Sequence, residues 1–244
     1  YSVIATFLAL FGRYDVIHFH AEGPCSMIWL PHLFGIHTVA TIHGLDWQRA
    51  KWGGFATKFL KFGEKTAAKY EDELIVLSEG TRDYLKEAYG RETVFIPNGI
   101  DVQNEKKADI ITKKYGLEKD GYILFLARIV PEKGLHYLID AFMQTDTDKK
   151  LVIAGGVSHS GEYAKQIHDM AKDDRIIFTG FVEGDELWEL YYNCRMYVLP
   201  SDVEGMPISL LEAMACGCEC LVSDIDTAKN VVGEYGYTLK KSDV

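Results

Sequence analysis

The 244-residue sequence lacks any run of eighteen apolar residues, although 48% of its residues are hydrophobic. A helix that crosses a membrane needs about 20 such residues in succession, so the sequence predicts no spanning helix. The apolar opening, Tyr1 to Phe11, also lacks the basic start and the cleavage site of a signal peptide, and we expect it to be the end of a buried helix. The composition predicts a globular protein of one large or two ordinary domains.

Basic residues are too few for a typical nucleic-acid-binding protein. The 26 Lys and Arg are outnumbered by 36 Asp and Glu, giving a net charge of −10, and we expect no nucleic-acid partner. The five cysteines also lack the paired Cys-x2-Cys spacing of zinc sites. We interpret them as small buried residues in a reducing compartment, and we expect a cytoplasmic protein. The short Asp224-Ile-Asp226 segment is interpreted as an ordinary polar loop rather than a metal site.

Short apolar runs alternate with helical patterns along the whole sequence. The runs are continuously apolar, which is typical of parallel strands covered on both faces. This alternation predicts an α/β fold with parallel sheets and right-handed crossovers. The expected strands cover residues 15–20, 38–42, 73–77, 93–96, 122–127, 151–154, 175–178, 196–199 and 220–223.

The polar stretch 98–107 is the best internal boundary in the sequence. It follows one expected strand and precedes a charged helix. We therefore expect two Rossmann-like domains, residues 1–105 and 106–244.

Two glutamates, Glu204 and Glu212, bracket a junction between a loop and a helix. Pro207 suits the first turn of a helix, because its missing N–H would be unpaired there in any case. Gly205 lets the backbone approach a ligand closely, and the N–H groups after it would point toward an anion. A phosphate site flanked by carboxylates would fit a nucleotide sugar. The alternative is an ordinary capped helix with two surface glutamates.

Ligands of open parallel sheets bind beyond the carboxyl ends of the strands, which directs attention to the loops there. Arg128 and Lys133 share one such loop, and two cations beside a helix start suit a diphosphate. The alternative is a solvated loop with incidental charges. His43 ends another strand and would be presented to a ligand or bonded to a neighbouring loop. His18 and His20 lie on one face of a strand, and we assign them to structure.

These loops, in this order, resemble the retaining family-4 glycosyltransferases, also called group 1 glycosyltransferases, of the GT-B fold. The resemblance implies two Rossmann-like domains that face each other across a cleft. It also implies that the sequence is a fragment, with an incomplete N-terminal domain that lacks its first strand and loop, and without the C-terminal helix. The matching segments are Thr41–Gly44, Ile96–Asp101, Ala127–Gly134, Ile153–Gly156, Phe178–Phe181 and Pro200–Gly217.

The resemblance also implies a role for each matching residue. Arg128 and Lys133 would bind the donor diphosphate and stabilise its charge as it leaves. Glu204 would contact the transferred sugar, and Glu212 would hold the ribose hydroxyls. His43 would reach across the cleft to the donor sugar.

Three further positions complete the implied donor site. The backbone at Gly205 and Met206 would border the sugar and phosphate, and the backbone near Phe181 would meet the base. Asn98 would help to shape the cleft near the linker.

The implied activity is transfer of a hexose-type sugar from a nucleotide-diphosphate donor to a glycan or lipid-linked acceptor, with retention of anomeric configuration. Such an enzyme would serve polysaccharide biosynthesis. We favour a UDP-sugar over a GDP-sugar, and we expect no cofactor and no metal because cationic side chains would neutralise the phosphates. The alternatives are a sugar-nucleotide epimerase of the same fold and a non-catalytic glycosyltransferase-like binding protein.

Residues 51–70 form a basic segment in this acidic sequence. Five lysines against one glutamate, Glu64, give it a net charge of +4, and three phenylalanines recur at i, i+4 and i+7. We predict that this helix meets an anionic acceptor or makes peripheral contact with an anionic membrane at its inner face. The alternative is a core helix with solvated lysines. The residues concerned are Lys51, Lys58, Lys61, Lys65, Lys69, Phe55, Phe59 and Phe62.

Overall fold

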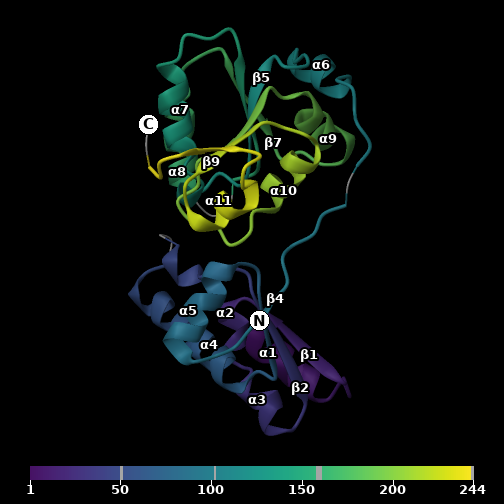
Figure 1. Cartoon of the computed structure of the whole chain (residues 1–244), viewed down its shortest axis with the longest axis vertical. Helices are drawn as coiled ribbons and strands as arrows, with labels where there is room; N and C mark the ends of the chain where they lie inside the picture. The colour runs from purple at the N-terminus through teal and green to yellow at the C-terminus, as the bar shows by residue number, and fades with distance from the viewer. Residues whose placement is uncertain (50–51, 102, 158–160, 243–244) are drawn as a thin grey trace. The chain divides into compact units, whose positions relative to one another are not determined.

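The computed structural model describes residues 1–49, 52–101, 103–157 and 161–242. The chain divides into two compact units, Tyr1–Asn98 and Gly99–Val244, and each is built on a parallel sheet with helices packed against it (Figure 1). The expected α/β class and parallel sheets are therefore confirmed. No helix among these residues is long and apolar enough to span a bilayer.

The first unit holds a four-stranded parallel sheet in the order β1-β2-β3-β4. Its strands are β1 (Val16–His20), β2 (His37–Ile42), β3 (Glu73–Val76) and β4 (Val94–Phe95). Its helices are α1 (Ser2–Leu10), α2 (Glu22–Cys25), α3 (Trp29–Leu33), the short 3-10 helix η1 (Asp46–Gln48), α4 (Gly54–Tyr70) and α5 (Glu79–Tyr89).

One face of this sheet forms the core of the first unit. Phe19 of β1 and Ile42 of β2 are buried there against side chains of α2, α4 and α5. Helix α1 packs along α2 and α3, and Thr6 is its one buried residue. Ile4 and Leu8 are 67% and 69% exposed. The expected helix is present, but the expectation that it is buried is wrong, because no described element covers its outer side.

Helix α4 buries a different face from the one that its phenylalanines mark. Phe55, Phe59 and Phe62 are 87%, 46% and 51% exposed, so they do not form a core face. The buried face includes Leu60 and Glu64. Lys51, at the start of the basic segment, lies outside the described residues.

Glu64 can be buried because three hydrogen bonds satisfy its carboxylate. Trp47 Nε1 donates to it at 2.9 Å, and the hydroxyls of Tyr84 and Tyr89 donate at 2.9 and 2.6 Å. The single acid of the basic segment therefore points inward, and the exposed side of α4 carries only cations among its charged groups.

The second unit holds a six-stranded parallel sheet in the order β10-β9-β8-β5-β6-β7. Its strands are β5 (Tyr122–Leu126), β6 (Lys150–Ala154), β7 (Ile176–Gly180), β8 (Met196–Leu199), β9 (Cys220–Ser223) and β10 (Tyr237–Leu239). Its helices are α6 (Ile110–Tyr115), the 3-10 helix η2 (Pro131–Lys133), α7 (Leu135–Met143), α8 (Gly161–Met170), α9 (Gly184–Asn193), α10 (Ile208–Ala215) and α11 (Asp226–Val232).

Both faces of the second sheet are covered, which explains the continuous apolar runs of its strands. Phe125 and Ile153 face the core under α7 and α8. Tyr122, Val152 and Tyr197 face the opposite core, which α6, α9, α10 and α11 cover.

The strand order reverses between β5 and β8. These strands are neighbours, yet the chain continues from β5 toward β6 and β7, and from β8 toward β9 and β10. Loops that leave such a switch point in opposite directions open a crevice beyond the carboxyl ends of the strands, where ligands of this architecture bind.

Candidate functional site

The loops that follow β5 and β8 are locked together through their backbones. Gly134 has φ +67°, and a Cβ at this position would lie 2.0 Å from the carbonyl oxygen of Pro200. Asp202 N donates to the carbonyl of Glu132 at 2.9 Å. Only glycine permits this close approach. The contact holds the loop that carries Lys133 against the loop that carries Glu204.

The loops after β6 and β7 extend the same edge. Ile129 N donates to Gly156 O at 3.1 Å, and Gly155 N donates to Gly180 O at 2.8 Å. A Cβ on Gly155 would lie 1.9 Å from Ala127 O. Four loops from consecutive strands of the sheet thus form one continuous backbone surface.

Lys133 and Glu204 form an ion pair on this surface. Their side chains are only 14% and 7% exposed, so the pair is largely shielded from water. Ser201 is fully buried, and its hydroxyl donates to Glu204 Oε1 at 2.7 Å. The expectation gave the two charged residues separate roles, and the structure brings them into direct contact.

Arg128 provides a second cation beside this pair. It is exposed, and its guanidinium makes no ion pair within the described part of the chain. Arg128 and Lys133 place two positive charges in the loop after β5, and a pair of cations suits an anion that carries more than one charge.

The start of α10 lies next to this charge. Pro207 is the cap residue before the helix rather than part of its first turn, one position earlier than expected. Ile208 and Ser209 are the first helical residues, whose N–H groups have no partner within a helix. The hydroxyl of Tyr197, on β8, donates to Ser209 Oγ at 2.8 Å and so ties the first turn of α10 to the sheet. Gly205 and Met206 are half-buried and link Glu204 to the helix.

Glu212 lies one and a half turns into α10 and is held by a tyrosine from α9. The hydroxyl of Tyr191, which is 1% exposed, donates to Glu212 Oε2 at 2.9 Å. Burial raises the pKa of Tyr191 far above its usual range, so its hydroxyl remains a donor. Among the described residues, Glu212 Oε1 makes no hydrogen bond.

Phe181 follows β7 at the end of the same edge and is 76% exposed. Its side chain therefore has no core role.

The remaining predicted site residues, His43 and Asn98, belong to the first unit. His43 follows β2, and its Nε2 lies 3.0 Å from Nδ1 of His20. Burial lowers the pKa of His43, and the neighbouring His20 lowers it further, against an opposing effect of Asp46. Asn98 is the last residue of its unit, and the contributions of both residues to the site stay predictions.

The sequence interpretation missed Ser201 and Tyr191. Ser201 carried a weak signal, because it lies three residues before Glu204 in the same loop. Tyr191 carried none, because it lies 21 residues from Glu212 on another helix. Among the residues that the structure describes, no group of three or more His, Cys, Asp or Glu side chains could hold a metal ion.

Models of two protein families match the chain. The model described as "Glycosyl transferases group 1" matches residues 107–243, and the model described as "Glycosyltransferase Family 4" matches residues 2–104. The first match covers the whole edge just described, including Arg128, Lys133, Glu204 and Glu212.

Curated relatives agree with these matches. An uncharacterized glycosyltransferase of Bacillus subtilis, YqgM, is 30% identical over 218 residues, which are 86% of this chain and 59% of the relative. The phosphatidyl-myo-inositol mannosyltransferase of Mycobacterium leprae is 28% identical over 242 residues, which are 95% of this chain and 62% of the relative. The chain thus spans about three fifths of the length of these relatives.

Solved structures share the fold. HepE from Anabaena, in complex with UDP and glucose, matches with a TM-score of 0.84 and 20% identity over 98% of this chain and 68% of that one. Sucrose-phosphate synthase from Thermosynechococcus elongatus matches with a TM-score of 0.84 and 23% identity over 99% of this chain and 65% of that one. These likenesses indicate a GT-B-type architecture, and the family matches identify the chain as a member of the group 1 glycosyltransferase family.

Proposed function

We propose that the second unit binds a nucleotide-diphosphate sugar at the carboxyl edge of its sheet, and that the protein transfers the sugar to a glycan or lipid-linked acceptor with retention of configuration. The observation that carries this proposal is the shielded Lys133–Glu204 pair beside the exposed Arg128. Glu204 forms an ion pair with Lys133. A bound diphosphate would compete for the lysine and leave the carboxylate for the sugar.

The chemistry of the donor fits this arrangement. Breaking the bond between the anomeric carbon and the diphosphate oxygen develops negative charge on the leaving group. Arg128, Lys133 and the first N–H groups of α10 would donate hydrogen bonds to that leaving group. Preorganised donors at the point where charge develops are the most effective form of electrostatic stabilisation. Because the two cations neutralise the phosphates, we propose transfer without a metal ion or other cofactor.

Glu212 and Phe181 fit the nucleoside end of the same donor. The free oxygen of Glu212 would accept from a ribose hydroxyl, and the backbone near Phe181 would border the base. We favour a UDP-sugar: HepE was solved with UDP and with UDP-glucose, and a relative from Escherichia coli is named as a UDP-Gal-dependent galactosyltransferase.

Thermal unfolding with UDP, GDP and ADP, in the presence of a metal chelator, tests donor binding. A nucleotide present at 100 times its dissociation constant stabilises its binding unit by about 2.7 kcal/mol. We expect the largest shift with UDP. No shift with any nucleotide would favour a non-catalytic role, whereas interconversion of free UDP-sugars would favour the epimerase.

Retention has its own test. The proton coupling constant at the anomeric carbon of the transferred sugar, measured by NMR on the product, reports its configuration. We expect the configuration of the donor, and inversion would contradict the proposed course of the reaction.

We also propose that α4 makes peripheral contact with an anionic membrane surface. The supporting observation is that Phe55, Phe59 and Phe62 are exposed along the side of α4 that also exposes Lys58 and Lys65. Aromatic side chains and lysines on one outer surface suit the boundary between lipid headgroups and acyl chains. A lipid-linked acceptor would be met at the same surface.

A further inference from the structure

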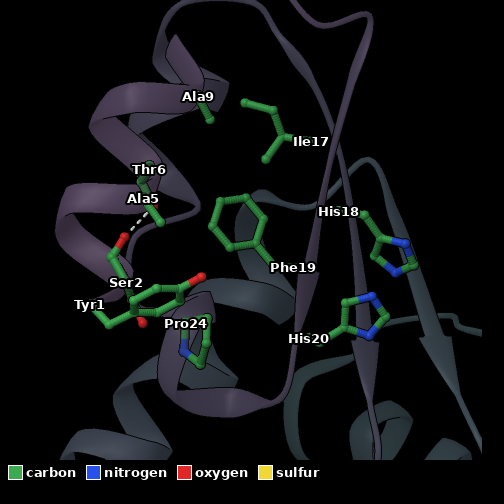
Figure 2. Close-up of a pocket in the computed structure, with 10 residues that line it drawn as sticks. All are labelled: Tyr1, Ser2, Ala5, Thr6, Ala9, Ile17, His18, Phe19, His20 and Pro24. Atoms are coloured by element: carbon green, nitrogen blue, oxygen red, sulfur yellow. Dashed lines mark hydrogen bonds between the residues drawn. The ribbon is translucent and has the colours of Figure 1, made fainter. Parts of the chain in front are cut away.

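Four polar side chains, those of His18, His20, Thr41 and His43, form a side-chain ladder across β1 and β2, in which each rung is one hydrogen-bonded pair. His18 and His20 alternate along β1 with the buried Phe19, and Figure 2 shows the two imidazole rings side by side on the opposite side of the strand from Phe19. Thr41 and His43 continue the ladder on β2 and in the loop that follows it. The ladder therefore lies on the face of the first sheet that is opposite its core.

The two rungs of the ladder repeat one geometry. In the parallel register, His18 pairs with Val39 and His20 pairs with Thr41. Each histidine bonds the side chain two residues beyond its register partner: His18 Nε2 lies 2.8 Å from Thr41 Oγ1, and His20 Nδ1 lies 3.0 Å from His43 Nε2. The ring centroids of His18 and His20 are 4.2 Å apart. The His43 ring is thus held through one specific nitrogen.

The position of the ring hydrogen determines whether the other nitrogen of His43, Nδ1, acts as a hydrogen-bond donor or acceptor. A neutral imidazole carries hydrogen on one nitrogen only, so one ring of the pair donates and the other accepts. Neutral histidine in water prefers its hydrogen on Nε2. With that tautomer on both rings, His43 Nε2–H donates to the bare Nδ1 of His20, and Nδ1 of His43 becomes an acceptor. Within the described residues, His43 Nδ1 makes no hydrogen bond.

The surroundings of His43 favour its neutral form. The titratable groups that face His43 are His20 and His18 from β1 and Asp46 from η1. Burial and the neighbouring imidazoles lower the pKa of both His18 and His43, while Asp46 acts in the opposite direction on His43 alone. His43 is therefore mainly neutral near pH 7, which permits a single tautomer to dominate.

We propose that His20 is a positioning residue for sugar transfer: its hydrogen bond holds His43 in one tautomer and one orientation, so that Nδ1 of His43 is presented as a hydrogen-bond acceptor to a substrate hydroxyl. This inference rests on the proposed function, because the substrate hydroxyl is one that takes part in the proposed sugar transfer. Partners that fix a histidine tautomer in this way are common where an imidazole must present a defined nitrogen.

Long-range proton–nitrogen NMR spectra of the full chain at pH 7 test the tautomer without any turnover. We expect widely separated nitrogen shifts for His43, with hydrogen on Nε2. His20→Phe removes the acceptor and should give averaged shifts of two tautomers. His20→Gln supplies an amide oxygen as acceptor and should keep the single tautomer. His18→Gln, which removes only the other rung, should leave the His43 shifts in place.

Transfer kinetics separate a positioning role from a merely structural one. We expect kcat/KM to fall about tenfold in His20→Phe, the effect of losing one ordinary hydrogen bond, and to recover in His20→Gln, with the melting temperature and the UDP affinity unchanged. Averaged His43 shifts in the unchanged protein, or an unaltered kcat/KM in His20→Phe, would overturn the inference. Failure of UDP to bind would instead overturn the proposed function, and the spectra would still report the tautomer.

Discussion

Lys133 and Glu204 stand 71 residues apart in the sequence and form an ion pair beyond the carboxyl ends of the neighbouring strands β5 and β8. The contact joins the two loops that leave the switch point of the second sheet. It places a carboxylate, which we assign to the sugar, directly against a cation, which we assign to the diphosphate. Both assignments therefore depend on the same few backbone contacts, above all the approach of Gly134 to Pro200.

Replacing Gly134 with alanine tests that dependence. The new Cβ would lie 2.0 Å from Pro200 O at a left-handed φ, and we expect a loss of about 2–5 kcal/mol together with loss of UDP binding. Gly116→Ala is the matched control, because Gly116 has φ +59° and the nearest atom to its Cβ would be Lys150 Nζ at 3.8 Å. The control should cost only about 1 kcal/mol. Thermal unfolding measures both, and equal losses would contradict the proposed loop contact.

Tyr191→Phe tests how Glu212 is held. The variant removes the donor 2.9 Å from Glu212 Oε2 and should cost about 1 kcal/mol of stability. Because the freed carboxylate would no longer be oriented toward the ribose, we expect the preference for UDP over its 2′-deoxy analogue to shrink. Calorimetric titration with both nucleotides measures this preference. An unchanged preference would show that Tyr191 does not orient a ribose-binding group.

The sequence predicted the strands, and therefore the loops that follow them, because a buried parallel strand carries a local signal. Runs such as Leu151–Ala154 are apolar throughout since two layers of helices cover them. The ion pair between Lys133 and Glu204 was not predicted, because it depends on which strands are neighbours. Strand order arises from packing of the whole sheet and leaves no mark on either loop.

Helix α4 shows why periodicity alone does not identify a buried face. Phe55, Phe59 and Phe62 have the spacing of a core stripe, yet the buried face contains the charged Glu64. Three donors from other elements satisfy its carboxylate, and their positions could not be known before the fold.

Vesicle binding tests the exposed side of α4. We expect the full chain to bind vesicles that contain anionic lipid, and a variant with Lys58, Lys61 and Lys65 changed to Glu to bind at least tenfold more weakly, since each basic residue near such a surface contributes about 1 kcal/mol. A variant with the exposed Lys113, Lys165 and Lys172 of the second unit changed to Glu has the same net charge and serves as the control. Equal binding by the two variants would end the proposal.

Buried carboxyls in the first unit predict loss of stability toward alkaline pH. Burial and the nearby Glu64 raise the pKa of Glu22 well above its usual range, and burial raises the pKa of Glu71 to about 8. In the unfolded chain both ionise near pH 4.3. The unfolded state therefore binds fewer protons than the folded state above that pH, and the free energy of unfolding should fall from about pH 5 to pH 8.

Glu22→Gln isolates this effect. Glutamine matches the protonated carboxyl in shape and cannot ionise, so the variant should be more stable than the unchanged protein at pH 8 and should lose less stability between pH 5 and pH 8. Denaturant unfolding at both pH values measures the difference. The exposed Glu87, changed to Gln, should leave the pH dependence as it was. An identical slope in Glu22→Gln would mean that Glu22 is ionised in the folded protein.

Calorimetric titration of the full chain with UDP, in the presence of a metal chelator and with Lys133→Ala and Glu204→Gln alongside, tests whether Lys133 and Glu204 belong to a metal-independent nucleotide site. We expect one UDP site per chain in the absence of metal. The affinity should be at least tenfold weaker in Lys133→Ala, since a charge-assisted hydrogen bond is lost. It should be equal or higher in Glu204→Gln, because Lys133 is then released for the diphosphate. Metal-dependent binding, or a UDP affinity that Lys133→Ala leaves unchanged, would contradict the proposed donor site.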